Sequence, residues 1–254
     1  MGALTGKTAL VTGASRGIGR AIATRLAADG AMVVVHFGAD ANGAAATVAE
    51  IERAGGTALA VGAELGMDDD VETLFTGLET ALSGRPLDIL VNNAAAPPAG
   101  PIGATTRAEF DHLFAVNVRA PYFIIQRALP LFRDGGRIIT ISSVATRMAN
   151  PAQTSFAMTK GAVETMSRTL ANQLGDRGIT VNAVAPGATR TLANEEVFEA
   201  PGLAELIAGS TALGRLGEAD DVADVVAFLA SDAARWITGQ VIDASGGLFL
   251  GPRG

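Results

Sequence analysis

The chain has 254 residues, no cysteine and a formal net charge of −7, and 48% of its residues are hydrophobic. The negative charge, with no run of Lys or Arg, argues against binding nucleic acid or an anionic membrane, and without cysteine there is no disulfide, thiolate nucleophile or Cys-rich metal site, so no bound metal is expected. The amino terminus lacks a signal-peptide pattern and no apolar run approaches the ~18 residues that span a bilayer, so we expect a cytoplasmic protein.

Short apolar segments alternate with longer amphipathic ones along the whole chain. The pattern predicts strands at Thr8–Val11, Met32–Val35, Thr57–Val61, Leu87–Val91, Arg137–Ile141, Ile179–Val184 and Val241–Ile242. It predicts helices at Arg20–Ala28, Ala41–Ala54, Asp68–Leu82, Arg107–Val118, Pro121–Phe132, Ser155–Gly175 and Ala219–Ser231. Continuous apolar strands separated by helices indicate a doubly wound parallel sheet of about seven strands, a Rossmann fold with three α/β/α layers.

Every segment between the predicted elements is too short or too structured to be a linker. We therefore expect residues 1–254 to form one dinucleotide-binding oxidoreductase domain. The longest irregular region follows the strand ending near Val184, and it holds a short helix expected at about Glu195–Ala208. Because long segments after a strand of such a sheet often cover a site, we expect a substrate lid at about 188–217.

A glycine-rich turn, Thr12–Gly19, follows the first predicted strand and leads into a helix. Its spacing is G-x-x-x-G-x-G. Glycines allow a tight turn and a close approach of a phosphate to the backbone, and the helix amino terminus offers free N–H groups to a pyrophosphate. In this strand–turn–helix context the turn predicts a nucleotide site.

Together with later motifs, this turn resembles the short-chain dehydrogenase/reductase family, and most of all its 3-oxoacyl-carrier-protein reductase-like branch. Thr12–Gly19 is similar to the family's T-G-x-x-x-G-I-G turn, and Asn92–Ala95 resembles its N-N-A-G motif with Ala in the last place. Ser143, thirteen residues before Phe156, resembles the catalytic serine, and Lys160 the lysine of the Y-x-x-x-K motif. The family's catalytic asparagine corresponds to Asn117, and its P-G turn to Pro186 and Gly187. The resemblance covers essentially the whole chain.

The resemblance implies a nicotinamide cofactor. The expected contacts are Gly13, Ser15, Arg16, Gly17, Ile18, Gly19, Phe37, Gly38, Glu64, Leu65, Asn93, Ala94, Lys160, Pro186, Gly187, Thr189 and Thr191. No acidic residue stands at the end of the second strand to bind a ribose 2′-hydroxyl, because Asp40 comes a few residues late and is expected to cap a helix. Arg16 is placed to meet a 2′-phosphate. We therefore expect NADP (NADPH) rather than NAD.

In the family, a tyrosine hydroxyl transfers the proton while a hydride passes between the nicotinamide and a carbonyl carbon. By this resemblance, the lysine holds the nicotinamide ribose and lowers the tyrosine pKa, and the serine hydrogen-bonds the carbonyl oxygen. The asparagine anchors a water in a proton relay. Asn117, Ser143 and Lys160 are present, but Phe156 stands at the tyrosine position. General acid–base catalysis contributes 10²–10⁴-fold, so its loss costs roughly 3–5.5 kcal/mol of barrier.

Other proton routes stay open: Ser143 with a water, or Lys160 itself. The single tyrosine of the chain, Tyr122, is expected to pack along its helix instead. Three explanations of Phe156 also stay open: an engineered Tyr-to-Phe change, a natural enzyme with another proton route, and a natural NADP-binding regulatory or structural protein without catalysis. The substrate, a carbonyl or alcohol, is not identified among polyketide, acyl thioester, steroid and sugar ketones. The resemblance further implies a homotetramer or homodimer.

Overall fold

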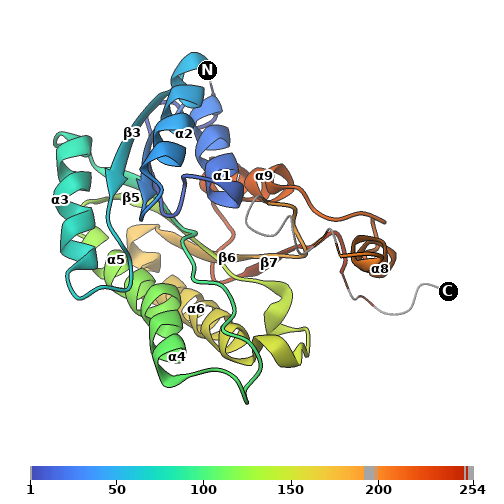
Figure 1. Ribbon diagram of the computed structural model, residues 1–254. Coiled ribbons are helices and arrows are strands. Elements are labelled where there is room, and N and C mark those ends of the chain that lie inside the picture. The colour runs from blue at the N-terminus through green and yellow to red at the C-terminus, as the bar shows by residue number, and fades with distance from the viewer. Residues whose placement is uncertain (1, 192–197, 199, 249, 251–254) are drawn as a thin grey trace.

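The computed structural model describes residues 2–191, 198, 200–248 and 250, and in these residues a seven-stranded sheet forms the centre (Figure 1). The strands are β1 (Thr8–Val11), β2 (Met32–Phe37), β3 (Thr57–Gly62), β4 (Leu87–Asn92), β5 (Phe132–Ile141), β6 (Thr180–Pro186) and β7 (Val241–Ala244). Their spatial order is β3-β2-β1-β4-β5-β6-β7, and every neighbouring pair is parallel. The predicted doubly wound parallel sheet is confirmed.

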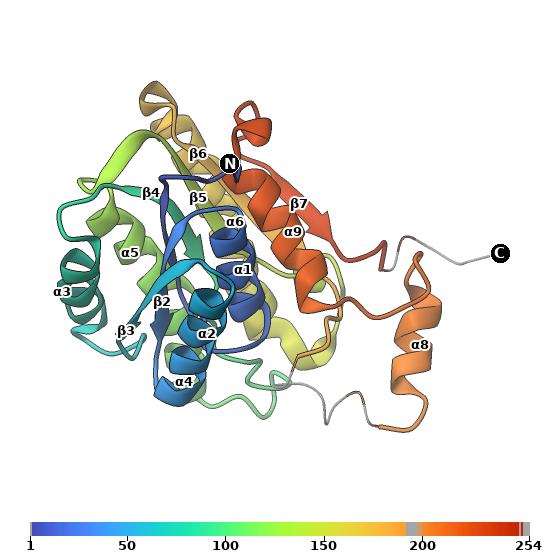
Figure 2. The ribbon, with the colours of Figure 1, turned by 90° about the horizontal axis from the view of Figure 1, so that it is seen from above.

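Helices cover both faces of the sheet (Figure 2). One layer contains α1 (Gly17–Ala28), α2 (Ala41–Arg53) and α9 (Ala219–Ala230), and the other contains α3 (Asp70–Leu82), α4 (Arg107–Phe114), α5 (Ala120–Ala128) and α6 (Thr154–Gln173). Strand side chains alternate between faces, so Val91 packs in the first layer and Leu90 in the second. Both faces are thus buried, which is why the strands are apolar at nearly every position. No helix in the described part of the chain is long and apolar enough to cross a membrane.

The helices expected at Arg107–Val118 and Pro121–Phe132 form one helical run. A π-helical segment, Ala115–Arg119, joins α4 to α5. The predicted helix end at Phe132 is wrong: α5 ends at Ala128, and Phe132 is the first residue of β5, where it pairs with Leu87. Pro130 accounts for the difference, because proline cannot continue a helix and restricts the residue before it.

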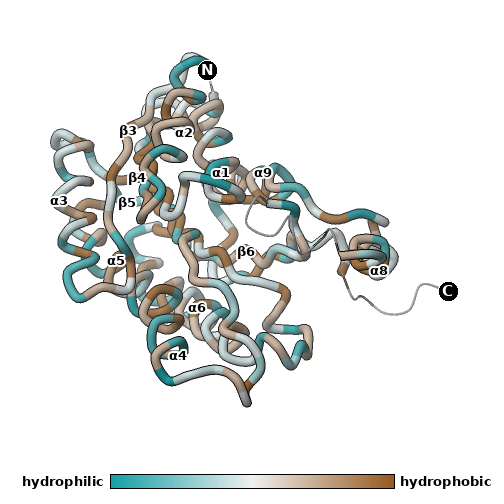
Figure 3. Tube along the Cα trace, viewed as in Figure 1, coloured by the Kyte–Doolittle hydropathy of each residue, from teal (hydrophilic) through white to brown (hydrophobic). Residues whose placement is uncertain are grey.

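After β6, the helix α8 (Leu203–Ser210) starts and ends later than the helix expected at Glu195–Ala208. Residues 192–197 and 199, which include the start of that expected helix, lie outside the described residues. No side chain of α8 is buried, and α8 stands away from the sheet in both ribbon views. Hydrophobic colour dominates α8 in Figure 3, and Leu206 is 67% exposed. The segment after β6 thus carries an exposed apolar helix.

Candidate functional site

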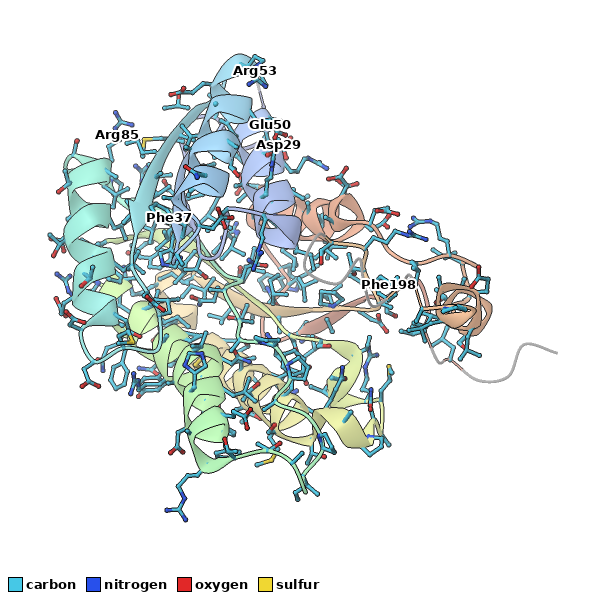
Figure 4. The ribbon with its side chains drawn as sticks, in the orientation of Figure 1. Asp29, Phe37, Glu50, Arg53, Arg85 and Phe198 are labelled. Carbon is cyan, nitrogen blue, oxygen red and sulfur yellow. The ribbon has the colours of Figure 1, made fainter. Side chains whose placement is uncertain are left out.

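The carboxyl ends of the parallel strands bring together loops that are far apart in the sequence. The glycine turn follows β1, residues 93–106 follow β4, and residues 142–153 follow β5. Figure 4 shows both ends of the sheet: Asp29, Arg53 and Arg85, which precede β2, β3 and β4, lie at one end, whereas Phe37, the last residue of β2, lies toward the other. Ligands of such sheets bind outside the carboxyl ends of the strands, so the candidate site lies at this edge.

The glycine turn needs its glycines for two different reasons. Gly13 and Gly17 have φ angles of +64° and +56°, which favour glycine. At Gly19 space is limiting, because an added Cβ would lie 2.2 Å from the carbonyl oxygen of Gly13 and 2.4 Å from Nδ2 of Asn93. Since α1 starts at Gly17, the turn brings the free N–H groups of a helix amino terminus to the carboxyl edge of the sheet.

Two polar side chains hold the turn against the loop after β4. Nδ2 of Asn93 donates to the carbonyls of Thr12 and Gly13, at 2.9 and 3.0 Å. Oγ1 of Thr12 accepts from the main-chain N–H groups of Asn93 and Ala94, at 2.9 and 3.0 Å. The side chain of Asn93, expected to contact the cofactor, therefore also fixes the shape of the turn. Thr12 was not among the expected site residues, although it belongs to the motif.

His36 holds the turn from the other side. Its Nδ1 lies 3.1 Å from the main-chain nitrogen of Gly13 and accepts that N–H, and its Nε2 lies 2.9 Å from the carbonyl oxygen of Ala63. The first contact requires an unprotonated Nδ1, so Nε2 carries the proton and donates to Ala63. Burial lowers the pKa of His36 from 6.5 to about 4, against the opposing effect of the Ala63 bond. His36 is a neutral brace between β1, β2 and β3.

A cleft of about 550 Å³ opens beside the turn. Among the expected cofactor residues, those that line it are Gly13, Ser15, Arg16, Gly17, Ile18, Gly19, Gly38, Glu64, Leu65, Asn93, Ala94 and Thr191. Arg16 is exposed at the cleft, whereas Asp40 uses its carboxylate to accept from the N–H of Gly43 and cap α2, as expected. Glycine contacts, a helix amino terminus and a cationic side chain in one cleft fit a phosphorylated dinucleotide.

Phe37 is another of the expected cofactor contacts. Phe37 does not line the cleft; its ring packs with the core beneath α1 and α2 and lies over Gly62, where an added Cβ would meet ring atom Cζ at 2.9 Å. The reason is strand alternation: His36, one residue earlier, points to the opposite face of β2 and reaches the cleft. His112, which no motif indicated, also lines the cleft.

A second, smaller hollow of about 150 Å³ lies at the ends of β6 and β7, and Gly187, Thr189, Leu213 and Ser245 are in its wall. An added Cβ on Gly187 would lie 2.9 Å from Cβ of Ser245, so glycine allows the chain to pass β7 closely. Pro186 is the last residue of β6. Thr191, two residues after Thr189, lines the large cleft, so the segment after β6 borders both hollows.

Asn117 lies in the π-helical segment and is 3% exposed. Its Oδ1 accepts from the N–H of Ala96 at 2.7 Å, and its Nδ2 donates to the carbonyl of Ala96 at 3.3 Å and to Oγ1 of Thr159 at 3.2 Å. Thr159 in turn donates to the carbonyl of Phe156 at 2.7 Å. The amide thus connects the loop after β4 with the turn of α6 that carries Phe156.

Phe156 packs against Ala96, Leu113 and Val116. Ala96 and Val116 also line the large cleft, so the half-buried ring lies directly behind one wall of the cleft. Phe156, at the position where the sequence resemblance expects a proton donor, has no hydroxyl. Tyr122 does not replace it: Tyr122 is 50% exposed on α5 and packs edge-on against Phe123, with ring centres 5.2 Å apart.

Lys160 follows Phe156 by one turn of α6, and its side chain is buried. Its Nζ donates a 2.8 Å hydrogen bond to the carbonyl of Ile141, the last residue of β5, and lies 5.4 Å from the centre of the Phe156 ring. Burial lowers the pKa of Lys160 from 10.5 to about 8, because the ammonium loses its hydration. No carboxylate of the described residues lies within ion-pair distance of Nζ. An unpaired buried ammonium costs stability, which is typical of a functional rather than a structural lysine.

Ser143 follows the end of β5 and is half-buried. Its Oγ accepts a 3.1 Å hydrogen bond from the N–H of Ala145, and within the described residues its hydroxyl donates no hydrogen bond. Two hydroxyls that flank Ser143 in the sequence, those of Ser142 just before it and Thr146 three residues after it, contact Oε1 of Glu164. No motif indicated Glu164. The available signal was its position four residues after Lys160, which places both side chains on one helix face.

The chain matches a family model described as enoyl-(acyl carrier protein) reductase over residues 13–249. It is 42% identical over 257 residues to versicolorin reductase stcU of Emericella nidulans, covering 97% of each chain.

Two solved structures are more similar still. One is the angucycline C-6 ketoreductase LanV with bound NADP, at 51% identity and a TM-score of 0.94, with 98% of each chain covered. The other is the promiscuous reductase LugOII, which catalyses keto-reduction at C1 during lugdunomycin biosynthesis; it is 53% identical with a TM-score of 0.93, covering 98% of this chain and 99% of that one.

Proposed function

The chain belongs to the short-chain dehydrogenase/reductase family, and from this premise we propose that it is an NADP-dependent ketone reductase whose activity is impaired by Phe156. One observation carries the proposal. Ala96 and Val116 line the dinucleotide cleft and also pack against Phe156, whose ring centre lies 5.4 Å from Nζ of Lys160. These contacts support one site made of the cofactor cleft, Phe156 and Lys160, in which a phenyl ring would fill the position of the proton donor.

We assign NADP(H) as the cofactor. LanV is solved with NADP bound and is similar over 98% of this chain. Gly13, Gly17 and Gly19 would let the pyrophosphate approach the turn and the start of α1, and the exposed guanidinium of Arg16 would pair with the 2′-phosphate. Gly187 and Thr189 would border the nicotinamide end from the loop after β6.

The catalytic roles that we propose follow the contacts of each side chain. When bound, NADPH supplies a hydride to the carbonyl carbon. Ser143 would donate to the carbonyl oxygen, and Lys160 would hold the nicotinamide ribose. Because the amide of Asn117 is bonded to Ala96 and Thr159, Asn117 would hold the loop after β4 in register with α6.

Phe156 removes the side chain that would protonate the alkoxide. The expected loss is about 10²–10⁴-fold in turnover, while cofactor and substrate binding remain. Residual turnover would take its proton from Lys160 or from a water held by Ser143.

For the substrate we propose a ketone on a fused-ring aromatic polyketide. The two solved structures named above are described as an angucycline C-6 ketoreductase and as a reductase that acts during lugdunomycin biosynthesis. The walls around the carboxyl edge expose large apolar side chains: Ile102 is 82% exposed, Leu206 67% and Leu213 70%. An apolar rim of this kind would suit a flat, hydrophobic substrate, since burial of that surface on binding is favourable.

The decisive experiment compares the chain with its Phe156→Tyr variant, using NADPH and a panel of ketones that includes polycyclic aromatic ones. We expect similar NADPH binding in both proteins and about 10²–10⁴-fold faster turnover in the variant. Tyr122→Phe is the matched control, because it removes the hydroxyl of the chain's single tyrosine, which lies on α5 outside the site. If neither protein binds NADPH, the proposal fails. If both turn over equally fast, the role assigned to position 156 is wrong.

A non-catalytic NADP-binding protein is the alternative, and it predicts NADPH binding without turnover by the Phe156→Tyr variant on any ketone.

We further propose one domain over residues 1–254 with a lid at about 188–217, a cytoplasmic location, and a homotetramer or homodimer. Exposed apolar side chains on the long helices support the assembly: Phe123 on α5 is 44% exposed and Met158 on α6 is 51% exposed. Light scattering that returned a monomer would contradict it.

A further inference from the structure

Helix α6 contacts the end of β5 through two side chains that are one turn apart. Lys160 donates to the carbonyl of Ile141 at 2.8 Å, and Glu164 accepts from the hydroxyl of the next residue, Ser142, at 2.6 Å. The two contacts fix both the height and the rotation of the strand end relative to the helix. Ser143 is the first residue after this double contact.

The same carboxylate oxygen also reaches the other side of Ser143. Oγ1 of Thr146 lies 3.1 Å from Oε1 of Glu164 and 3.1 Å from the carbonyl oxygen of Ser143, so the single hydroxyl proton of Thr146 serves both acceptors. The main-chain N–H of Thr146 donates to that carbonyl too, at 3.3 Å. Glu164 is therefore linked to Ser143 through a residue before it and a residue after it.

The carboxylate has no competing task in the described part of the chain. No Lys, Arg or His lies within ion-pair distance of Glu164 there. Its partners are hydroxyls, and hydrogen bonds from hydroxyls to an ionised carboxylate are shorter and roughly twice as strong as neutral ones. Ser142 is 3% exposed, so its bond to Glu164 is shielded from water.

We propose that Glu164 is a positioning residue for Ser143: it sets the loop Ser142–Thr146 so that the Ser143 hydroxyl is held at a fixed distance from Lys160. This inference rests on the proposed function. It matters more here than in a chain with tyrosine at position 156, because Ser143 carries the one hydroxyl among Asn117, Ser143, Phe156 and Lys160.

The test uses the Phe156→Tyr protein as its active background and introduces Glu164→Ala and Glu164→Gln. The amide oxygen of glutamine still accepts both hydroxyls, so we expect Glu164→Gln to stay within about threefold of the background and Glu164→Ala to lower kcat about 10- to 100-fold. KM for NADPH should not change in either variant. Thr165→Ala, on the exposed face of the same helix, is the control.

If Glu164 acts by positioning Ser143, the effect of replacing Glu164 should disappear once Ser143 is removed. In a protein that also carries Ser143→Ala, Glu164→Ala should lower kcat by less than about threefold, since interacting residues are non-additive. If Glu164→Ala costs the same factor with and without Ser143, its effect is general and the proposal is wrong.

Hydrogen exchange gives a second measurement that needs no turnover. In the chain with Phe156 retained, Glu164→Ala should speed exchange of the Ala145 and Thr146 amides at least about tenfold, while the amides of β1 keep their protection. Unchanged exchange at Ala145 and Thr146 would overturn the proposal. Faster exchange, together with a Phe156→Tyr protein that reduces no ketone, would retain the positioning role of Glu164 and refute the proposed function instead.

Discussion

Lys160 and Phe156 face each other across one turn of α6, with the ammonium 5.4 Å from the ring centre and hydrogen-bonded to the carbonyl of Ile141. The π face of the ring attracts the ammonium, but the ring has no proton to give or take. A tyrosine here would have its hydroxyl in the field of the same charge, which favours ionisation of that hydroxyl. The pair thus combines a buried charge with a ring that carries no titratable group.

The first prediction concerns stability at alkaline pH. The pKa of Lys160 is about 8 in the folded chain and 10.5 for an unburied lysine. Between these values the unfolded chain binds a proton that the folded chain has released, so the free energy of unfolding should rise with pH across the window, by up to about 3 kcal/mol in total.

Denaturant unfolding at steps from pH 8 to 10.5 measures this rise. Lys160→Met should remove it, whereas a substitution of Lys7, the other lysine of the chain, should leave it in place. An identical pH dependence in the Lys160→Met variant would show that the ammonium is not buried as described.

The second prediction concerns stability at acid pH. His36 is buried and neutral, with a pKa of about 4 against 6.5 for a free histidine. As the pH falls from 6.5 to 4, the unfolded chain takes up a proton that the folded chain refuses, so His36 should destabilise the fold progressively, by about 3 kcal/mol in total. Below the folded pKa this contribution levels off.

The measurement is the difference in unfolding free energy between the chain and a His36→Gln variant at each pH. As the pH falls from 6.5 to 4, the unfolding free energy of the chain should decrease relative to that of the His36→Gln variant by about 1.4 kcal/mol per pH unit. His112→Gln removes the chain's other histidine and serves as the control, since it should not alter that slope. A pH-independent difference for His36→Gln would be incompatible with a neutral brace.

The third prediction concerns the shape of the glycine turn. Gly19→Ala places a Cβ 2.2 Å from the carbonyl oxygen of Gly13, so the main chain has to move. We expect a loss of about 1–3 kcal/mol in unfolding free energy and at least about tenfold weaker NADPH binding, measured by cofactor fluorescence. Gly175→Ala, where nothing lies within 4 Å of the added Cβ, should leave NADPH binding unchanged. Equal NADPH affinity for both variants would argue against a cofactor site at this turn.

The fourth prediction concerns the choice of cofactor. If Arg16 pairs with the 2′-phosphate, Arg16→Ala should weaken NADPH binding about 10- to 100-fold, the value of a charge-assisted hydrogen bond, and leave NADH binding nearly unchanged. Arg53→Ala is the matched control, because this exposed arginine lies at the opposite end of the sheet (Figure 4). A parallel loss of NADH binding would mean that Arg16 supports the turn rather than reads the phosphate.

Most of the fold could be predicted because its signals are local. Apolar runs mark strands that are buried on both faces, and their alternation with amphipathic segments predicts a parallel sheet. The helix end near Phe132 was wrong because the pattern there is apolar on both sides of Pro130, and only pairing with Leu87 makes Phe132 part of a strand.

By itself, the sequence determined the fold class, the glycine turn, and the identities of Ser143, Phe156 and Lys160 at their spacing, since each depends on residues close together in the chain. The tertiary structure decided which side chains support them. His36 reaches both Gly13 and Ala63, Asn117 reaches Ala96 and Thr159, and Glu164 reaches the two hydroxyls beside Ser143. These contacts join residues 18 to 42 positions apart in the sequence, and no local pattern records them. Their geometry exists only when strand ends and helix faces have packed together.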